Sequence, residues 1–372
     1  MKKILFVQKG DLSEANPNTI RVLRNEFPEY PVEVFDIEKD FINKQKFIRR
    51  INWLYMILEY GWGILFKNKK IYFCYHRTSY LFRQIKKYFE NNFNNNDYVF
   101  VIQTQSIFYA KIPGIPFFVY TDGTVYSNLY FPSADYKKLI FHSKSWINLE
   151  KTIYQDADLN FVFSSYYQKS LIKQYYIDPQ KVINIHAGTN PVYSNTNKVK
   201  NYSNKKILFA GKDWERKGGP VLVEAFKKVL IKHPDAQLII VGCKPVIEIP
   251  NCTILGKVNL ETLDKCYNEA SIYCMPSWIE YFGIVYIDAM NHKLPVIASN
   301  IASVPDFIKS GINGYLINPG DVDGIANALI ELLDDAEKCK RFGEAGYEIA
   351  QNDFTWEKVG EKLKNHIQPF IR

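Results

Sequence analysis

The chain has 372 residues, of which 47% are apolar and 23% are charged, and its formal net charge is +8. This length predicts two domains, and this composition excludes a disordered chain because it supplies enough apolar side chains for full cores. The charge is unevenly placed, since residues 41–90 hold 11 basic, 2 acidic and 14 aromatic residues. One basic, aromatic segment therefore accounts for nearly all of the excess positive charge.

Secreted and membrane-spanning classes do not fit this sequence. The apolar run near the N-terminus, residues 4–7, is shorter than the roughly 7–15 apolar residues of a secretory signal. The longest apolar stretch, residues 51–66, contains Asn52, Glu59 and two glycines, whereas a membrane-spanning helix needs about 20 residues with few charges. The six cysteines show no paired C-x-x-C spacing. We expect a protein of the reducing cytoplasm without a transmembrane helix.

The first half alternates short apolar strands with helical segments. Residues 8–18 are interpreted as a polar loop. We expect strands at 3–7, 32–35, 98–103, 116–120, 159–164 and 182–186, and helices at 19–25, 41–93, 143–156 and 166–175. This alternation predicts a parallel sheet that is covered by helices on both faces.

The pattern pauses in an Asn/Ser-rich stretch at 191–205, which is interpreted as an interdomain linker, and then restarts. The second half predicts strands at 206–210, 237–241, 253–255, 272–275 and 295–298, and helices at 219–232, 260–269, 284–292, 303–309, 322–333 and 338–350. The sequence therefore predicts two Rossmann-like α/β domains, at 1–195 and 205–352. A last amphipathic helix, 353–372, is expected to pack back on the first domain.

A basic, glycine-rich loop follows the first strand of the second domain. It contains Lys212, Arg216 and Lys217 and ends at Gly218-Gly219, where a helix begins. Open α/β sheets bind ligands at the carboxyl ends of their strands, and cations with free backbone N–H groups suit a phosphate. A solvated basic turn is the alternative interpretation.

A second loop, Pro276 to Gly283, joins the strand that ends at Met275 to a helix that begins near Ile284. Glu280 lies in the turn and Asp288 about one turn inside the helix. A helix N-terminus attracts an anion, and carboxylates on either side of a diphosphate could bind hydroxyl-rich groups, which is the shape of a nucleotide-sugar. Alternatively, Glu280 caps the helix and Asp288 is a surface acid.

These residues resemble a known family. The pattern is Glu280, then seven residues, then Asp288, with Phe282-Gly283 after the first acid. It is similar to the signature of retaining glycosyltransferases of family 4, which have the GT-B fold. The segments 295–299 and 311–321 add to the resemblance, which is close over 205–352 and weaker over 98–190. It implies two Rossmann-like, doubly wound domains that face each other across a cleft.

The resemblance implies a role for each matching residue of the second domain. Glu280 would contact the donor sugar near its reacting carbon, and Asp288, where the family has Glu, would bind the ribose. Lys217, with Arg216 or Lys212, would neutralise the leaving diphosphate. The remaining donor-binding positions are Phe282, Gly283, Ile284 and Val285, of which the last three would offer their backbone amides to the distal phosphate.

The resemblance also implies the chemistry of the reaction. The substrates would be a UDP- or GDP-linked sugar and a glycan or lipid-linked acceptor, as in polysaccharide or glycolipid biosynthesis. No cofactor or metal is implied, and the six histidines are scattered without ligand spacing. Two departures stand out: Ala302-Ser303 replaces paired glycines, and the first-domain loop 121–124 has no His. Asp122 is the candidate for that pocket.

Two questions stay open at this point. The segment 41–90 has three interpretations: an ordinary basic surface over buried aromatics, a surface that contacts anionic membrane, or a nucleic-acid site, for which no motif is present. The fold also allows a nucleotide-sugar epimerase, a phosphorylase, or a sugar-nucleotide-binding protein without catalytic activity.

Overall fold

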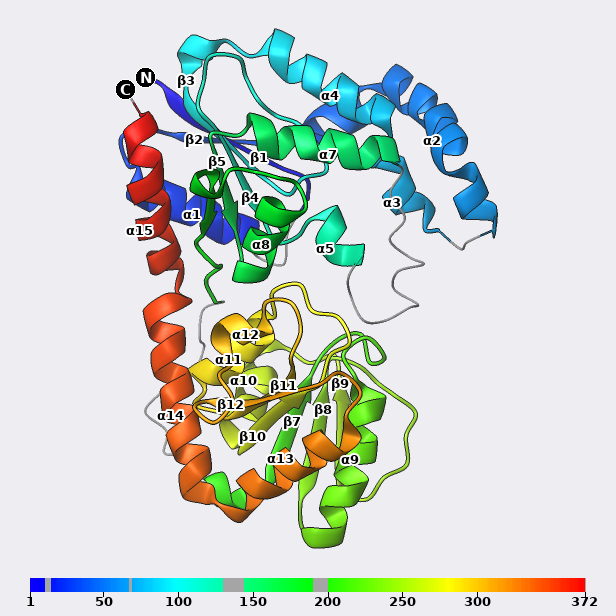
Figure 1. The fold of residues 1–372 in the computed structure, drawn as a ribbon, viewed down its shortest axis with the longest axis vertical. Coiled ribbons are helices and arrows are strands. Elements are labelled where there is room, and N and C mark those ends of the chain that lie inside the picture. The colour runs from blue at the N-terminus through cyan, green and yellow to red at the C-terminus, as the bar shows by residue number, and fades with distance from the viewer. Residues whose placement is uncertain (11–14, 67–68, 130–143, 190–199, 372) are drawn as a thin grey trace. The chain divides into compact units, whose positions relative to one another are not determined.

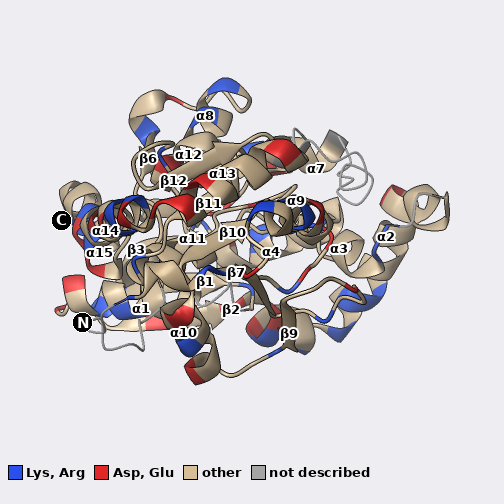
Figure 2. Cartoon of the chain, turned by 90° about the horizontal axis from the view of Figure 1, so that it is seen from below, with Lys and Arg blue, Asp and Glu red and all other residues tan. Residues whose placement is uncertain are grey.

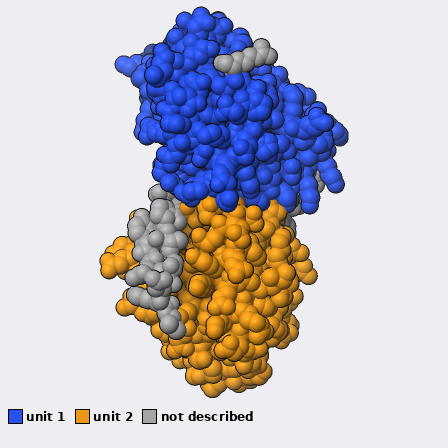
Figure 3. Space-filling view, turned by 90° about the vertical axis from the view of Figure 1, so that its left-hand side faces the viewer, with its two compact units in different colours: residues 1–187, 356–372 blue, residues 188–355 orange. Residues whose placement is uncertain are grey.

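The computed structural model describes residues 1–10, 15–66, 69–129, 144–189 and 200–371 (Figure 1). Its contacts divide the chain into two compact units, each of which is described by itself below (Figure 3). Unit 1 comprises residues 1–187 and 356–372, and unit 2 comprises residues 188–355.

Unit 1 is built on a sheet that has six parallel strands within the described residues, in the order β2-β1-β3-β4-β5-β6. Apolar residues fill β3 and β4 almost completely, and both strands are buried throughout, as expected when helices cover both faces. The strands are β1 (Lys3–Gln8), β2 (Val32–Asp36), β3 (Tyr98–Thr104), β4 (Phe117–Thr121), β5 (Leu159–Val162) and β6 (Val182–Asn184).

Helices cover the two faces of this sheet. Helix α1 lies on one face, where α15 packs against it, and α4 with α7 lies on the other (Figure 1). The helices of unit 1 are α1 (Ala15–Glu26), α2 (Lys46–Phe66), α3 (Ile71–Tyr75), α4 (Ser79–Asn92), α5 (Val125–Leu129), α7 (Lys144–Asp156), α8 (Ser165–Lys173) and α15 (Trp356–Ile367).

Unit 2 has a second parallel sheet, also of six strands in the described part, in the order β12-β11-β10-β7-β8-β9. Its helix α13 packs on α9 over one face, while α14 packs on α11. The elements are β7 (Lys206–Ala210), α9 (Gly219–Lys232), β8 (Gln237–Val241), β9 (Cys252–Gly256), α10 (Leu260–Glu269), β10 (Ile272–Met275), α11 (Ile284–Asn291), β11 (Val296–Ser299), α12 (Val304–Phe307), β12 (Gly314–Ile317), α13 (Val322–Asp334) and α14 (Ala336–Asp353).

The predicted fold class is confirmed by two doubly wound parallel sheets, and some elements differ locally from the expected ones. The loop expected at 8–18 ends early, because α1 begins at Ala15 and buries Asn16, whose amide donates to the carbonyl of Gly10 (2.8 Å). Strand β12 was missed, since its four residues begin at a glycine and three of them are half-exposed. The final helix begins at Trp356 and ends at Ile367, inside the expected 353–372.

The stretch expected to link the domains is described only in part. Residues 190–199 lie outside the described residues. The side chain of Lys200 is held by unit 2, where its ammonium donates to the carbonyls of Tyr267 (2.7 Å) and Ala270 (3.1 Å) at the end of α10. The described end of this stretch therefore packs on unit 2.

Helix α15 reaches unit 1 at the far end of the chain and lies close to α1. A Cβ atom at Gly360 would meet Val22 Cγ1 at 2.9 Å and Glu26 Cγ at 3.1 Å, so the two helices approach each other at a position without a side chain. The contact depends on this small residue.

We predict that Gly360→Val destabilises the protein by about 1–3 kcal/mol, because the added side chain would force α15 away from α1. Asn365→Val, at an exposed position of the same helix, adds the same side chain without a clash and serves as the control. Thermal unfolding followed by circular dichroism measures both. Equal melting temperatures for the two variants would contradict the close packing.

Candidate functional site

The two loops singled out in the second half follow neighbouring strands. Strands β7 and β10 pair directly, with Ile207 opposite Ile272 and Leu208 opposite Tyr273. The strand order reverses between these two strands, since the chain runs outward from β7 through β8 to β9 and from β10 through β11 to β12. Ligands of open α/β sheets bind at such a reversal, outside the carboxyl ends of the strands.

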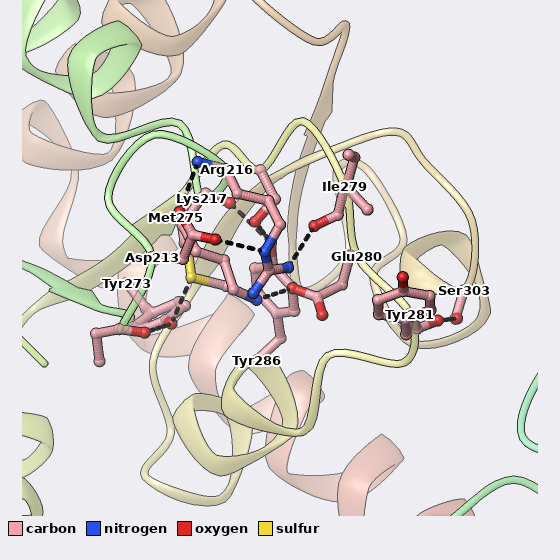
Figure 4. A network of polar contacts seen from close by, with 12 residues as sticks. Asp213, Arg216, Lys217, Tyr273, Met275, Ile279, Glu280, Tyr281, Tyr286 and Ser303 are labelled. Atoms are coloured by element: carbon pink, nitrogen blue, oxygen red, sulfur yellow. Dashed lines mark hydrogen bonds and ion pairs between the residues drawn. The ribbon is translucent and has the colours of Figure 1, made fainter. Parts of the chain in front are cut away.

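Hydrogen bonds of Arg216 hold the two loops together (Figure 4). The amide of Trp278 donates to the carbonyl of Arg216 (2.9 Å), and the Arg216 guanidinium donates back to the carbonyl of Ile279 (3.0 Å). The same guanidinium donates to Asp213 (3.1 Å). Arg216, predicted to bind the diphosphate, therefore also fastens the loop after β7 to the loop after β10.

The central feature of the site is an ion pair between Lys217 and Glu280 (Figure 4). Lys217 comes from the loop after β7 and Glu280 from the loop after β10, and both are buried, with 8% and 5% of their surfaces exposed. Burying an isolated charge costs several kcal/mol, so each of these charges depends on the other. The structure thus brings together two residues that the sequence proposed for one site.

Helix α11 begins beside this ion pair. Its N-cap, Gly283, has φ +95°, and a Cβ atom there would lie 2.7 Å from the ring of Tyr286. Tyr286 is itself fixed, because its hydroxyl donates to the carbonyl of Met275 (2.8 Å) at the end of β10. The first N–H groups of a helix lack intrahelical acceptors, so Ile284 and Val285 begin a helix whose positive end lies next to Glu280 in sequence and space.

Asp288 lies one turn further along α11 and is half-buried. Burial raises the pKa of its carboxyl from 3.8 to about 7. Next to it, Tyr267 donates to the carbonyl of Val285 (3.3 Å) and stacks on His292, 4.8 Å between ring centroids. His292 in turn contacts Asp264 (2.9 Å). Asp288 is therefore a poorly solvated acid on a firmly held helix.

Lys212, Phe282 and Ala302, which the sequence analysis also singled out, differ in burial and backbone conformation. Lys212 is exposed, whereas the ring of Phe282 is buried against Phe307 and Phe354, at centroid distances of 6.0 and 6.4 Å. Phe282, expected among the donor-binding positions, therefore packs its ring into the core and positions the loop. At the family's paired-glycine position, Ala302 keeps a positive φ of 42°. The backbone there retains the conformation that glycine favours.

Asp122 belongs to unit 1, where it follows β4. Burial raises the pKa of its carboxyl to about 6.

A buried acid that the sequence analysis missed, Glu150, holds this loop. It accepts hydrogen bonds from Ser106 Oγ (2.6 Å), the amide of Val125 (3.2 Å) and the hydroxyl of Tyr175. Glu150 lies between Leu149 and Lys151 of α7, and this local sequence gives no sign that its carboxylate holds a loop.

No group of three or more His, Cys, Asp or Glu side chains in the described ranges is placed to hold a metal ion. Among the helices in the described part of the chain, none is long and apolar enough to cross a membrane.

Comparison with known proteins identifies relatives of the segment that carries this site. Residues 194–349 match the family model described as glycosyl transferases group 1. The GDP-mannose-dependent monoacylated alpha-(1-6)-phosphatidylinositol monomannoside mannosyltransferase of Corynebacterium glutamicum is 31% identical over 169 residues, which cover 41% of this chain and 44% of that protein. The D-inositol 3-phosphate glycosyltransferase of Corynebacterium diphtheriae is 27% identical over 58% of this chain and 57% of that protein. The chain spans about half the length of the curated relatives it matches.

Solved structures resemble the chain over nearly its whole length. Sucrose-phosphate synthase from Thermosynechococcus elongatus has a TM-score of 0.65 at 16% identity and covers 99% of each chain. HepE from Anabaena, in complex with UDP and glucose, has a TM-score of 0.62 at 16% identity, covering 99% of this chain and 100% of that one. These likenesses show that the chain has the GT-B type of fold, with two Rossmann-like units.

We predict that Gly218→Ala disrupts the site. Gly218 has φ +74°, and a Cβ atom there would lie 1.9 Å from the carbonyl oxygen of Pro276, which belongs to the neighbouring loop. The variant should be about 1–3 kcal/mol less stable than Gly311→Ala, because Gly311 has φ +81° but nothing within 4 Å of the added atom. Urea unfolding measures the difference. Similar losses in both variants would show that the two loops are not in tight contact.

Proposed function

We propose that the chain is a retaining glycosyltransferase of family 4, which transfers a sugar from a nucleotide-diphosphate donor to a hydroxyl of a glycan or lipid-linked acceptor. The observation that carries this proposal is the buried Lys217–Glu280 ion pair beside the N-terminus of α11, at the strand reversal of unit 2. The family model covers both loops that form this site.

In this proposal each part of the donor would bind a different part of the site. The ribose would lie at Asp288, and the diphosphate between Lys217 and the amides that begin α11. The sugar would then lie near Glu280, on the opposite side of the diphosphate from the ribose. In this arrangement Lys217 exchanges its contact with Glu280 for one with the diphosphate when the donor binds.

The reaction then needs charge stabilisation at two places. The bond between the sugar's anomeric carbon and the diphosphate oxygen breaks, and its electron pair stays with the diphosphate. Lys217 and the α11 amides stabilise that negative charge without reorganising. Glu280 stabilises the positive charge that develops on the sugar. The acceptor hydroxyl forms the new bond on the same face of the sugar, and its proton passes to the departing diphosphate.

The proposal includes catalysis without a divalent metal, because the fixed cations of Lys217 and Arg216 and the helix N-terminus can neutralise the leaving diphosphate themselves. It also includes a UDP- or GDP-linked donor. Relatives support both options: the Corynebacterium glutamicum protein is named GDP-mannose-dependent, and HepE was solved with UDP. The names of both Corynebacterium relatives contain inositol, which supports testing inositol-containing acceptors.

The proposal is tested first by a thermal-shift screen of UDP-, GDP- and ADP-sugars. A donor at 100 times its dissociation constant stabilises the fold by about 2.7 kcal/mol. The sugar that binds is then incubated with inositol phosphates, phosphatidylinositol and oligosaccharides, with and without EDTA. NMR of the product's anomeric proton reports retention. Conversion of the donor into its epimer, or binding without turnover across the panel, would contradict a transferase.

We predict that Glu280→Gln lowers transfer at least 10²-fold, since it removes the carboxylate charge beside the developing cation. Glu215→Gln, in the loop after β7 but with its side chain exposed, should keep wild-type activity. Because the variant also leaves Lys217 without its counter-charge, its melting temperature and donor-induced shift are measured beside its rate. Full activity in a folded Glu280→Gln variant would refute the assignment.

We predict that donor binding strengthens as pH rises through about 7. Burial raises the pKa of Asp288 to about 7, so its carboxyl is neutral below that pH and ionised above it. An ionised carboxylate accepts hydrogen bonds from both ribose hydroxyls better than a neutral one. The KM for the donor should therefore fall between pH 6 and pH 8, and Asp288→Asn should abolish that dependence. A flat wild-type profile would exclude ribose binding by the ionised acid.

A further inference from the structure

The outer surface of α2 is apolar although the described residues do not cover it. One stripe of the helix, spaced four, four and three residues apart, is buried: Asn52, Met56, Tyr60 and Gly63. The opposite stripe should be polar on a surface helix. It is instead formed by large apolar side chains, and all of them are exposed: Phe47, Leu54, Leu58 and Leu65.

No charge interrupts this surface after the first turns of α2. Between Ile51 and Phe66 the sequence contains one charged residue, Glu59. Its carboxylate is turned toward α4, where it accepts hydrogen bonds from the amide of Ser79 (3.0 Å) and from the Ser79 hydroxyl. Figure 2 shows α2 in tan over most of its length, with Lys and Arg toward one end.

The apolar surface continues onto α3. We call these side chains the α2–α3 face; each has between 47% and 80% of its surface exposed. They are Phe47, Trp53, Leu54, Ile57, Leu58, Trp62, Leu65, Phe66, Ile71, Tyr72 and Phe73. Single exposed apolar residues are ordinary, as at Ile231 of α9, but contiguous patches of this kind mark interaction surfaces. The exposure of the α2–α3 face among the described residues is therefore typical of an interaction surface.

The charges around this face indicate what covers it. Lys46, Arg49 and Arg50 are exposed at the start of α2, and Lys70 is exposed at the N-cap of α3. A second copy of the chain, related by a two-fold axis, would present the same face, in which the one acid of α2 and α3, Glu59, is already bonded to Ser79 and so does not balance these cations. The interface of a bilayer with anionic lipids instead offers phosphates to the cations and acyl chains to the apolar residues.

We propose that the α2–α3 face docks unit 1 on a membrane that contains anionic phospholipids. Helix α2, with 21 residues and a length of about 31 Å, would lie in the plane of the interface. Trp53 and Trp62 suit the headgroup level, where Trp is enriched. Lys46, Arg49 and Arg50 would bind lipid phosphates. This docking does not depend on the proposed function.

The docking surface is joined to the carboxyl edge of the sheet of unit 1. At the end of β1, the ammonium of Lys9 donates to the hydroxyl of Tyr72 on α3 (2.9 Å). Tyr72 also packs on His76, 4.7 Å between ring centroids, and His76 lies near Glu38. If the proposed function is correct, unit 1 binds the acceptor and this edge of its sheet is part of the acceptor-binding unit. Docking would then place the edge beside the bilayer that contains a lipid-linked acceptor.

Vesicle flotation with the full chain tests this proposal. Vesicles of phosphatidylcholine alone are compared with vesicles in which a third of the lipid is phosphatidylglycerol. We expect binding to the anionic vesicles that weakens as salt is raised. Leu54→Glu/Leu58→Glu should reduce binding at least tenfold, and so should Arg49→Gln/Arg50→Gln. Ile231→Glu, an equally exposed apolar position in unit 2, should bind like the wild type.

Several outcomes would overturn the proposal. These are no flotation of the wild type, equal binding to both vesicle types, or unchanged binding of the two double variants. Light scattering that shows a dimer which Leu54→Glu/Leu58→Glu converts to a monomer would identify a second copy as the occupant. The thermal shift by nucleotide-sugars is measured in the same variants. If a variant that no longer floats still shows the thermal shift with the nucleotide-sugar, membrane docking and donor binding are independent properties.

Discussion

The buried ion pair between Lys217 and Glu280 is the interaction on which the candidate site depends. Removing one partner of such a pair costs about 3–5 kcal/mol, since the other charge is left buried and unpaired. The two residues come from loops that follow different strands, so the pair exists only because β7 and β10 are neighbours in the sheet. The contacts between Arg216 and the opposite loop, and the start of α11 at Gly283, keep the two charges in place.

This arrangement places three kinds of group at one edge of a sheet: a cation, a carboxylate and a helix N-terminus. Each would be ordinary alone, but together they suit a substrate that is anionic at one end and rich in hydroxyls at the other. Two backbone positions make it possible. Gly218 and Gly283 both have positive φ, and a side chain at either would collide with the neighbouring loop or with Tyr286. The site is therefore specified by small residues as well as by charged ones.

Unit 1 shows a different division of roles. Its buried acid, Glu150, receives hydrogen bonds from several elements and holds the loop that carries Asp122. Part of its excess of cations lies at the start of α2 and at the N-cap of α3, on the helices that carry the exposed apolar face. The net charge of +8 thus reflects unit 1, whereas the candidate site in unit 2 contains only a few cations, among them Arg216 and Lys217.

The sequence by itself determined the alternating strands and helices, because local apolar patterns and turn residues act over short range. Helix α9 and strand β10 lie within the predicted bounds, whereas the half-exposed β12 carried too weak a pattern. The sequence also indicated Lys217 and Glu280 as candidate site residues, each in its own loop. Only the tertiary structure decided that these side chains, 63 residues apart, meet, that Phe282 packs inward, and that the described residues leave the outer stripe of α2 exposed. Strand order and burial arise from contacts between distant segments, which no local pattern records.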